Sequence, residues 1–317
     1  MTASSASSAR LHVVVTGASG LLGSALRRRL EAAGHRVSRL VRRTAGPGEI
    51  SWDPAARSLN PAALEGTDAV VHLSGENVGA RWTAARKARI RSSRVVSTRL
   101  LSETLAGLQR PPQVMVSASA VGIYGDRGDE VLTEDSPPGD PAGDFLVSVT
   151  QEWEKAAEPA RVEGIRVVHP RFGVVLSPAG GALRKMLLPF RLGLGARLGT
   201  GQQWMSWISI DDAVQAIDLA LTDDGLQGPV NVTAPEPVTN RDFTHTLARV
   251  LSRPALFAAP ESVLRLALGE MAQGTILSSA RVVPARLLQA GHRFGYPDVE
   301  SALRHVLRRD GRDKFVS

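Results

Sequence analysis

The feature that most constrains this chain is a glycine-rich turn that directly follows a short apolar run. Residues 11–15 are typical of a buried strand, and the spacing Gly17-x-x-Gly20-x-x-Gly23 comes just after them. Apolar residues then recur at helical spacing, so the pattern predicts strand, tight turn and helix. Gly17 permits the sharp exit, Gly20 lets a diphosphate approach the backbone, and Gly23 lets the helix pack against the sheet.

This strand–turn–helix unit predicts a site for a nucleotide cofactor. The N-terminus of a helix presents unpaired N–H groups and a partial positive charge, and both favour a diphosphate. We therefore expect the cofactor phosphates to lie on the turn. The predicted binding residues of the turn are Gly17, Ser19, Gly20, Leu21, Leu22 and Gly23.

The end of the second predicted strand, residues 37–41, indicates which dinucleotide binds. NAD sites usually place an acidic residue there to hold the ribose 2′-hydroxyl. Here no acidic residue occurs between Glu31 and Glu49, and the interval is rich in arginine. A guanidinium at Arg42 or Arg43 can pair with a 2′-phosphate, although both side chains could instead simply face solvent. The pattern favours NADP(H).

Further short apolar runs, at 69–73, 114–117, 164–168 and 229–232, alternate with helical stretches. This alternation predicts an α/β fold, namely a Rossmann-type doubly wound parallel sheet with a smaller, mostly helical C-terminal lobe. The expected organisation is a disordered tail at 1–10, an NADP-binding domain at 11–175 completed by about 205–233, a substrate and C-terminal lobe at 176–204 and 234–310, and a tail at 311–317.

Composition narrows the functional classes. The chain has no cysteine, which excludes disulfides and thiolate metal sites, and its histidines show no ligand spacing, so no metal is expected. No apolar run approaches the roughly 18–20 residues that span a bilayer, and the first ten residues lack the apolar core of a signal peptide. We expect a soluble, cytoplasmic protein without a membrane partner.

The net charge of +7 draws attention to residues 77–102, which contain no acidic residue and many basic ones. A solvated helix face explains such a stretch, and a phosphate-facing role for one or two of the arginines is the alternative. Nucleic-acid binding is the weakest interpretation, because Trp82 alone supplies an interleaved aromatic ring. We therefore expect no nucleic-acid partner.

Several segments together resemble the extended short-chain dehydrogenase/reductase superfamily, and most closely its atypical nucleoside-diphosphate-sugar epimerase branch, usually labelled "epimerase family protein". The resemblance covers about residues 11–310, including the extra C-terminal helical domain of that branch. The segments that carry it are 15–23, 73–77 with Arg81-Trp82, 117–125, 171–176, 207–212 and 268–272.

The resemblance implies further cofactor contacts. It places Leu73, Ser74 and Gly75 along the adenosine ribose and diphosphate, and it brings Pro170 and Arg171 near the nicotinamide. Arg94, in the basic stretch, becomes a phosphate partner. Relatives in this superfamily often dimerise through helices, which makes a homodimer one expected assembly.

Typical members of the superfamily transfer a hydride with the help of a Ser or Thr, and of a Tyr followed four residues later by a Lys that lowers the Tyr pKa. Ser119 matches the first position. The Tyr and Lys positions hold Phe145 and Val149, neither of which can exchange a proton. Tyr124 is a candidate surrogate acid/base; the alternative is that its ring packs over the substrate or closes the loop.

The sequence thus predicts an NADP(H)-dependent oxidoreductase or epimerase that acts on a small polar substrate, with nucleotide-linked compounds as one option. Its candidate catalytic residues are Ser119 and Tyr124. The missing Tyr–Lys pair supports a rival hypothesis, a catalytically silent NADPH-binding sensor or regulatory protein.

Overall fold

A computed structural model describes the backbone of residues 10–312 and the side chains of residues 10–308. The tail expected at 1–10 lies almost wholly outside these residues. Of the tail expected at 311–317, residues 311 and 312 belong to helix α10 (Val299–Arg312), and the rest lies outside the description.

The molecule is built on a central parallel sheet of order β14-β9-β6-β5-β1-β2-β3, with β4 antiparallel at the β3 edge. A short strand, β7 (Ser119–Ala120), also pairs with β9. The main strands are β1 (His12–Thr16), β2 (Arg36–Val41), β3 (Glu49–Asp53), β4 (Ser58–Leu59), β5 (Ala69–His72), β6 (Val114–Ser117), β9 (Arg166–Phe172) and β14 (Gly228–Val232).

Strand β1 lies at the point where the strand order reverses. Its residues Val13, Val14 and Val15 are fully buried, as expected for a parallel strand covered on both faces. β2 pairs with one side of β1 and β5 with the other, so the chain leaves β1 in one direction and later returns on the opposite side. Ligands of doubly wound sheets bind in the crevice at the carboxyl ends of the strands at such a point. The predicted Rossmann-type fold is confirmed.

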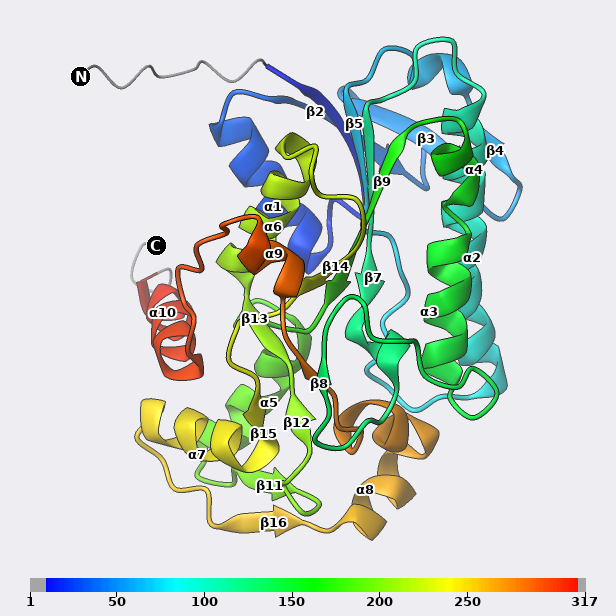
Figure 1. The fold of residues 1–317 in the computed structure, drawn as a ribbon. Coiled ribbons are helices and arrows are strands. Elements are labelled where there is room, and N and C mark those ends of the chain that lie inside the picture. The colour runs from blue at the N-terminus through cyan, green and yellow to red at the C-terminus, as the bar shows by residue number, and fades with distance from the viewer. Residues whose placement is uncertain (1–9, 313–317) are drawn as a thin grey trace, which may run out of the picture.

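Helices cover both faces of the sheet (Figure 1). One face packs against α1 (Leu21–Ala32), α6 (Ile210–Thr222) and α9 (Ala285–Gln289), and its core contains Leu26, Ile217 and Leu287. The other face packs against α2 (Ala84–Ala106) and α4 (Glu158–Val162), and α3 (Phe145–Lys155) lies beside α2 and contacts β7. None of the helices in the described residues is both long enough and apolar enough to cross a membrane.

The remaining elements form a smaller lobe below the carboxyl edge of the sheet (Figure 1). Its core joins α5, α7 and α10 through buried residues that include Leu187, Leu247 and Leu303. Several two-stranded pairs accompany the helices, so the lobe is less purely helical than its sequence pattern indicates. Its helices and paired strands are α5 (Gly181–Arg191), α7 (Asn240–Val250), α8 (Glu261–Leu268), β10 (Val174–Leu176) with β13 (Trp207–Ser209), β11 (Ala196–Leu198) with β16 (Phe257–Ala259), and β12 (Trp204–Met205) with β15 (Val238–Thr239).

Three short helical turns and one further strand pair complete the description. They are η1 (Pro61–Ala63), η2 (Val121–Tyr124), the π-helical turn η3 (Ala272–Ile276), and β8 (Val131–Leu132) paired with β17 (Arg281–Val282).

Candidate cofactor and active site

The glycine turn has the close backbone contacts that its spacing predicts. Gly17 has φ +65°, and a Cβ there would lie 2.7 Å from the carbonyl oxygen of Leu73. A Cβ at Gly23 would lie 2.2 Å from the Gly17 carbonyl oxygen. Helix α1 begins directly after Gly20, and among the described residues no side chain caps it. Its first-turn amides are therefore available to an anion.

The structure brings a second predicted cofactor segment, Leu73–Gly75, against this turn. Thr16, the last residue of β1, accepts hydrogen bonds at Oγ1 from the backbone N–H of Leu73 (3.1 Å) and of Ser74 (3.3 Å). The exits of two adjacent parallel strands are thus joined at the crevice. Residues about 57 positions apart in the chain form one continuous backbone surface.

The two candidate arginines, Arg42 and Arg43, have different surroundings in the structure. Arg43 donates to both oxygens of Glu49, at 2.7 and 2.6 Å, and Arg39 forms a second ion pair with the same carboxylate. Arg42 is exposed, and within the described residues it has no hydrogen bond or ion pair. Arg42 is therefore the guanidinium at the end of β2 that remains available for a phosphate, whereas Arg43 is bound to Glu49.

Arg94 lies behind the Leu73–Gly75 loop. It donates to the carbonyl oxygens of Glu76 (3.0 Å) and Ile90 (3.2 Å), and its guanidinium stands where a Cβ on Gly75 would come within 3.2 Å. Burial lowers its pKa to about 10. These contacts support the loop from the side of α2, and none of them directs Arg94 toward a cofactor phosphate.

Ser119 hydrogen-bonds into a buried ion pair. Its Oγ donates to Glu154 Oε1 at 2.6 Å, and Arg171 donates to both oxygens of Glu154, at 2.8 and 2.9 Å. Burial is the largest single influence on Glu154 and opposes its charge, but the hydrogen bonds and charge of Arg171, the nearby His169 and the hydrogen bond from Ser119 together outweigh it, so the pKa of Glu154 lies below its ordinary value. Because the single hydroxyl proton of Ser119 is already donated, only its lone pairs remain for another partner. The residue can accept a hydrogen bond but is not set to polarise a carbonyl by donating one.

Tyr124 occupies the other end of this network. The side chain is fully buried; its hydroxyl donates to Asn231 Oδ1 at 2.8 Å and accepts from Arg171 Nη1 at 2.9 Å. Burial raises the pKa of the phenol. The hydroxyl therefore ties η2 to β9 and β14, and this geometry gives no support to the hypothesis of a surrogate acid/base. Pro170 is likewise enclosed, within the pairing of β9 with β14.

The positions of the missing Tyr–Lys pair are covered by the C-terminal part of the chain. Phe145 packs edge-on against Trp82, with ring centroids 5.1 Å apart. Val149 is 1% exposed and shares an apolar cluster with Trp82 and Met271. A Cβ at Gly274 would lie only 2.9 Å from the Trp82 ring, which shows how closely η3 approaches. This face of α3 is a packing surface.

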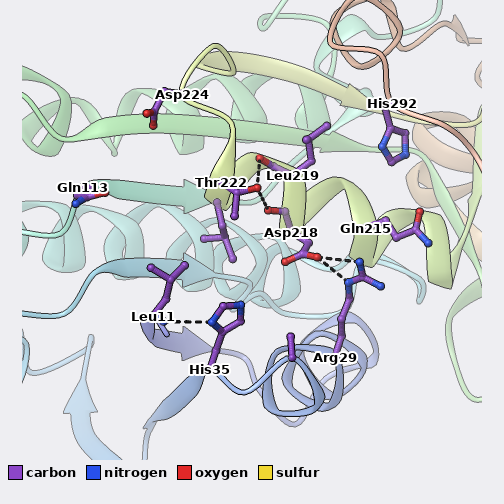
Figure 2. A pocket seen from close by; sticks show the side chains of 12 residues that line it. Leu11, Arg29, His35, Gln113, Gln215, Asp218, Leu219, Thr222, Asp224 and His292 are labelled. Carbon is purple, nitrogen blue, oxygen red and sulfur yellow. Dashed lines mark hydrogen bonds and ion pairs between the residues drawn. The ribbon is translucent and has the colours of Figure 1, made fainter. Parts of the chain in front are cut away.

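A separate cavity of about 600 Å³ lies at the opposite edge of the sheet (Figure 2). Leu11 and Gln113, which precede β1 and β6, contribute to its wall, and Arg29 pairs across it with Asp218. Because this cavity lies at the amino ends of the strands, it is distinct from the crevice beside the glycine turn.

Glu154, Asn231 and His72 belong to the polar networks of the site, and no sequence motif singles them out. Each partner is distant along the chain, as the separation of 107 positions between Tyr124 and Asn231 illustrates. For two of these three residues the sequence does contain an indication of a buried polar contact. His72 and Asn231 interrupt the apolar runs Val-Val-His-Leu and Val-Asn-Val, and a polar group in a buried strand requires a partner.

Comparison with known proteins agrees with this geometry. Residues 13–233 match the "NAD dependent epimerase/dehydratase family", and residues 259–306 match a domain of unknown function, DUF1731. The chain is 43% identical over 301 residues to the epimerase family protein Mb2239 of Mycobacterium bovis, covering 94% of this chain and 98% of that protein. It is 36% identical over 302 residues to the Homo sapiens epimerase family protein SDR39U1, covering 94% of this chain and all of that protein.

A solved structure of human SDR39U1 (isoform 2) with NADPH superposes with a TM-score of 0.87 at 35% sequence identity. The match covers 94% of this chain and 99% of that one. The family match, which extends over more than half of the sequence, and the near-complete coverage of these relatives identify the chain as a member of the NAD dependent epimerase/dehydratase family.

Proposed function

We propose that this protein binds NADP(H) in the crevice beside the glycine turn and uses it for hydride transfer with a small polar substrate. The observation that carries the proposal is the combination of a glycine-lined helix N-terminus with Arg42 at the end of the neighbouring strand: within residues 10–308, no side chain caps the helix and none pairs with Arg42. The NADPH in the human SDR39U1 structure supports the same choice of cofactor.

The choice of NADP(H) over NAD(H) follows from charge. A ribose 2′-phosphate needs a cation, and Arg42 offers a planar guanidinium that can bind it bidentately. A ribose 2′-hydroxyl would need a carboxylate, and the next one along the chain after β2, Glu49, is bound by Arg39 and Arg43. The cofactor's diphosphate would rest on the first turn of α1, where Gly20 leaves its approach open.

The protein's own contribution to the chemistry rests on Ser119. Bound NADP(H) supplies or accepts the hydride, and the protein must orient the reacting oxygen beside it. Ser119 donates its hydrogen bond to Glu154, so its lone pairs would accept one from the hydroxyl group of a polar substrate. When that hydroxyl group is oxidised, its proton would pass to Ser119 as Ser119 passes its own proton to Glu154, and the reverse transfer would accompany reduction. Nucleotide-linked sugars are one class of compound that offers such hydroxyl groups.

A second candidate function is that of an NADPH-responsive regulatory protein without turnover. The specific observation in its favour is that Phe145 and Val149 lie in an apolar cluster, where no proton can be exchanged. Tyr124, which could have replaced the missing tyrosine, is enclosed by Arg171 and Asn231.

Titration of the protein with NADPH and with NADH tests the shared part of both proposals. We expect NADPH to bind more tightly by about 1–3 kcal/mol, which is about 5- to 150-fold. Equal affinities, or no binding of either, would overturn the assignment.

Turnover then separates the two candidates. The protein is incubated with NADPH or NADP⁺ and a panel of carbonyl compounds, alcohols and nucleotide sugars, while absorbance of the reduced nicotinamide and product composition are followed. Consumption of cofactor, or epimerised product without net consumption, supports the enzyme. Tight NADPH binding with no product from any compound supports the regulatory role.

A further inference from the structure

A fully buried histidine connects the cofactor crevice to helix α2. His72 is the last residue of β5 and lies beside Thr16 of β1 in the parallel register. Its Nδ1 is 2.7 Å from Thr16 Oγ1, and its Nε2 is 3.2 Å from Ser97 Oγ on α2. Trp52 closes one side of the ring with an edge-on contact at 6.0 Å.

Only one assignment of donors and acceptors fits all the hydrogen bonds around His72. Thr16 Oγ1 already accepts the N–H groups of Leu73 and Ser74, so its own proton goes to Nδ1 of the imidazole. Nδ1 is therefore unprotonated, and the ring carries its proton on Nε2. This proton is donated to Ser97, whose hydroxyl in turn donates to the carbonyl oxygen of Ser93 at 2.7 Å.

Helix α2 holds the same loop through two further contacts. Ser93 Oγ accepts from the backbone N–H of Glu76 at 2.9 Å, and Arg94 donates to the carbonyl oxygen of Glu76 while packing behind Gly75. The segment from Leu73 to Glu76 is thus fixed on one side by Thr16 and on the other by α2. The glycine turn packs tightly against this segment, because a Cβ at Gly17 would lie 2.7 Å from the carbonyl oxygen of Leu73.

We propose that His72 is a positioning residue of the cofactor site: it directs the Thr16 lone pairs at the amides of Leu73 and Ser74, and so fixes this loop against the glycine turn. The inference rests on the proposed function, since it concerns the same NADP(H) crevice. The burial of His72 supports this inference. Burial lowers the pKa of His72 to about 3, so the ring stays neutral near pH 7 and the donors and acceptors around it keep the same roles.

Titration of variants with NADPH tests the inference. His72→Phe fills the space without either nitrogen, and Thr16→Val removes the acceptor; we expect each to weaken NADPH binding at least tenfold (about 1.4 kcal/mol). Thr16→Ser keeps the hydroxyl and should bind within about threefold of the unmodified protein. His72→Asn, whose amide oxygen can replace Nδ1, should recover part of the loss. Leu247→Ala, in the core of the lobe, is the control for general destabilisation and should leave the affinity unchanged.

A spectroscopic measurement on the unmodified protein provides a second readout. We expect ¹⁵N NMR of the imidazole to show the neutral ring with the proton on Nε2. A proton on Nδ1 would overturn the inference, as would natively folded His72→Phe and Thr16→Val variants with undiminished affinity. An unmodified protein that binds no NADPH would instead refute the proposed function, so the two failures are distinguishable.

Discussion

The glycine turn and helix α3 both carry positions of the superfamily's sequence pattern, but they differ in what fills those positions. At the turn, the proposed binding groups are backbone amides, and their positions depend on contacts that leave no room for a side chain at Gly17 or Gly23. On α3, the positions that hold the Tyr and Lys of the superfamily pattern carry Phe145 and Val149, packed under the C-terminal segment.

The difference shows how a fold can keep its cofactor site while its reactive groups change. Replacing a side chain on α3 leaves the helix intact, because Phe and Val pack well where Tyr and Lys would be polar. Replacing a glycine in the turn displaces backbone that packs against the segment after β5 and that is proposed to hold the cofactor. Conservation of the fold therefore does not by itself imply conservation of the reaction.

Gly23→Val should have the largest effect. The new Cβ would lie 2.2 Å from the Gly17 carbonyl oxygen, so the turn must move. We expect loss of NADPH binding and a decrease of about 3 kcal/mol or more in the free energy of unfolding, measured by urea denaturation. Gly164→Ala, at φ +84° with no atom within 4 Å of the new Cβ, should cost only about 1 kcal/mol. Comparable losses in the two variants would contradict the close packing of the turn.

Val149→Lys should also destabilise strongly, but without a loss of NADPH affinity. An unpaired ammonium in the cluster with Trp82 and Met271 should lower the free energy of unfolding by about 3–5 kcal/mol, and the folded fraction should keep its NADPH affinity. Val162→Lys, on the exposed face of α4, is the matched control and should cost little. A stable Val149→Lys protein with altered NADPH affinity would mean that α3 faces the cofactor.

Arg42→Ala should weaken NADPH binding by about 1–3 kcal/mol and leave NADH binding unchanged, because the lost guanidinium pairs only with the 2′-phosphate. Arg43→Ala is the natural comparison. That side chain is bound to Glu49, and its loss should change the ratio of the two affinities much less. A larger change in the ratio for Arg43→Ala would reverse the assignment.

Acid should remove the stabilisation that depends on neutral His72. The folded pKa of about 3 lies below the ordinary 6.5, so the contribution is complete above pH 6.5 and is lost as the pH falls toward 3, by about 1.4 kcal/mol per unit. The stability difference between the unmodified protein and His72→Phe should therefore shrink by about 1–2 kcal/mol between pH 7.5 and 5.0. Urea denaturation at both values measures it, and a constant difference would show that His72 is not buried in its neutral form.

The sequence was sufficient for the features that local patterns determine. The run at 11–15, the glycine spacing and the helix that follows are all present, since each depends on neighbouring residues. The absence of an acidic residue near Arg42 pointed to a phosphate, and the structure leaves that side chain without a partner in the described part of the chain.

The rest of the site depends on partners that no local pattern reveals. Arg94, the predicted phosphate partner, also holds the loop at Gly75 and Glu76, which the sequence does not indicate; its contact with a phosphate stays a prediction. Tyr124 reads as an available phenol, yet its hydroxyl lies between Arg171 and Asn231, contributed by two different strands. Assigning these roles requires the three-dimensional arrangement of β9, β14 and α2.

A crystal structure of the complex with NADPH tests the central claim most directly. The account predicts that the diphosphate contacts the first-turn amides of α1 beside Gly20, and that the 2′-phosphate lies within hydrogen-bond distance of Arg42. Density for the cofactor in the 600 Å³ cavity at the amino edge, or a 2′-phosphate bound away from Arg42, would contradict it.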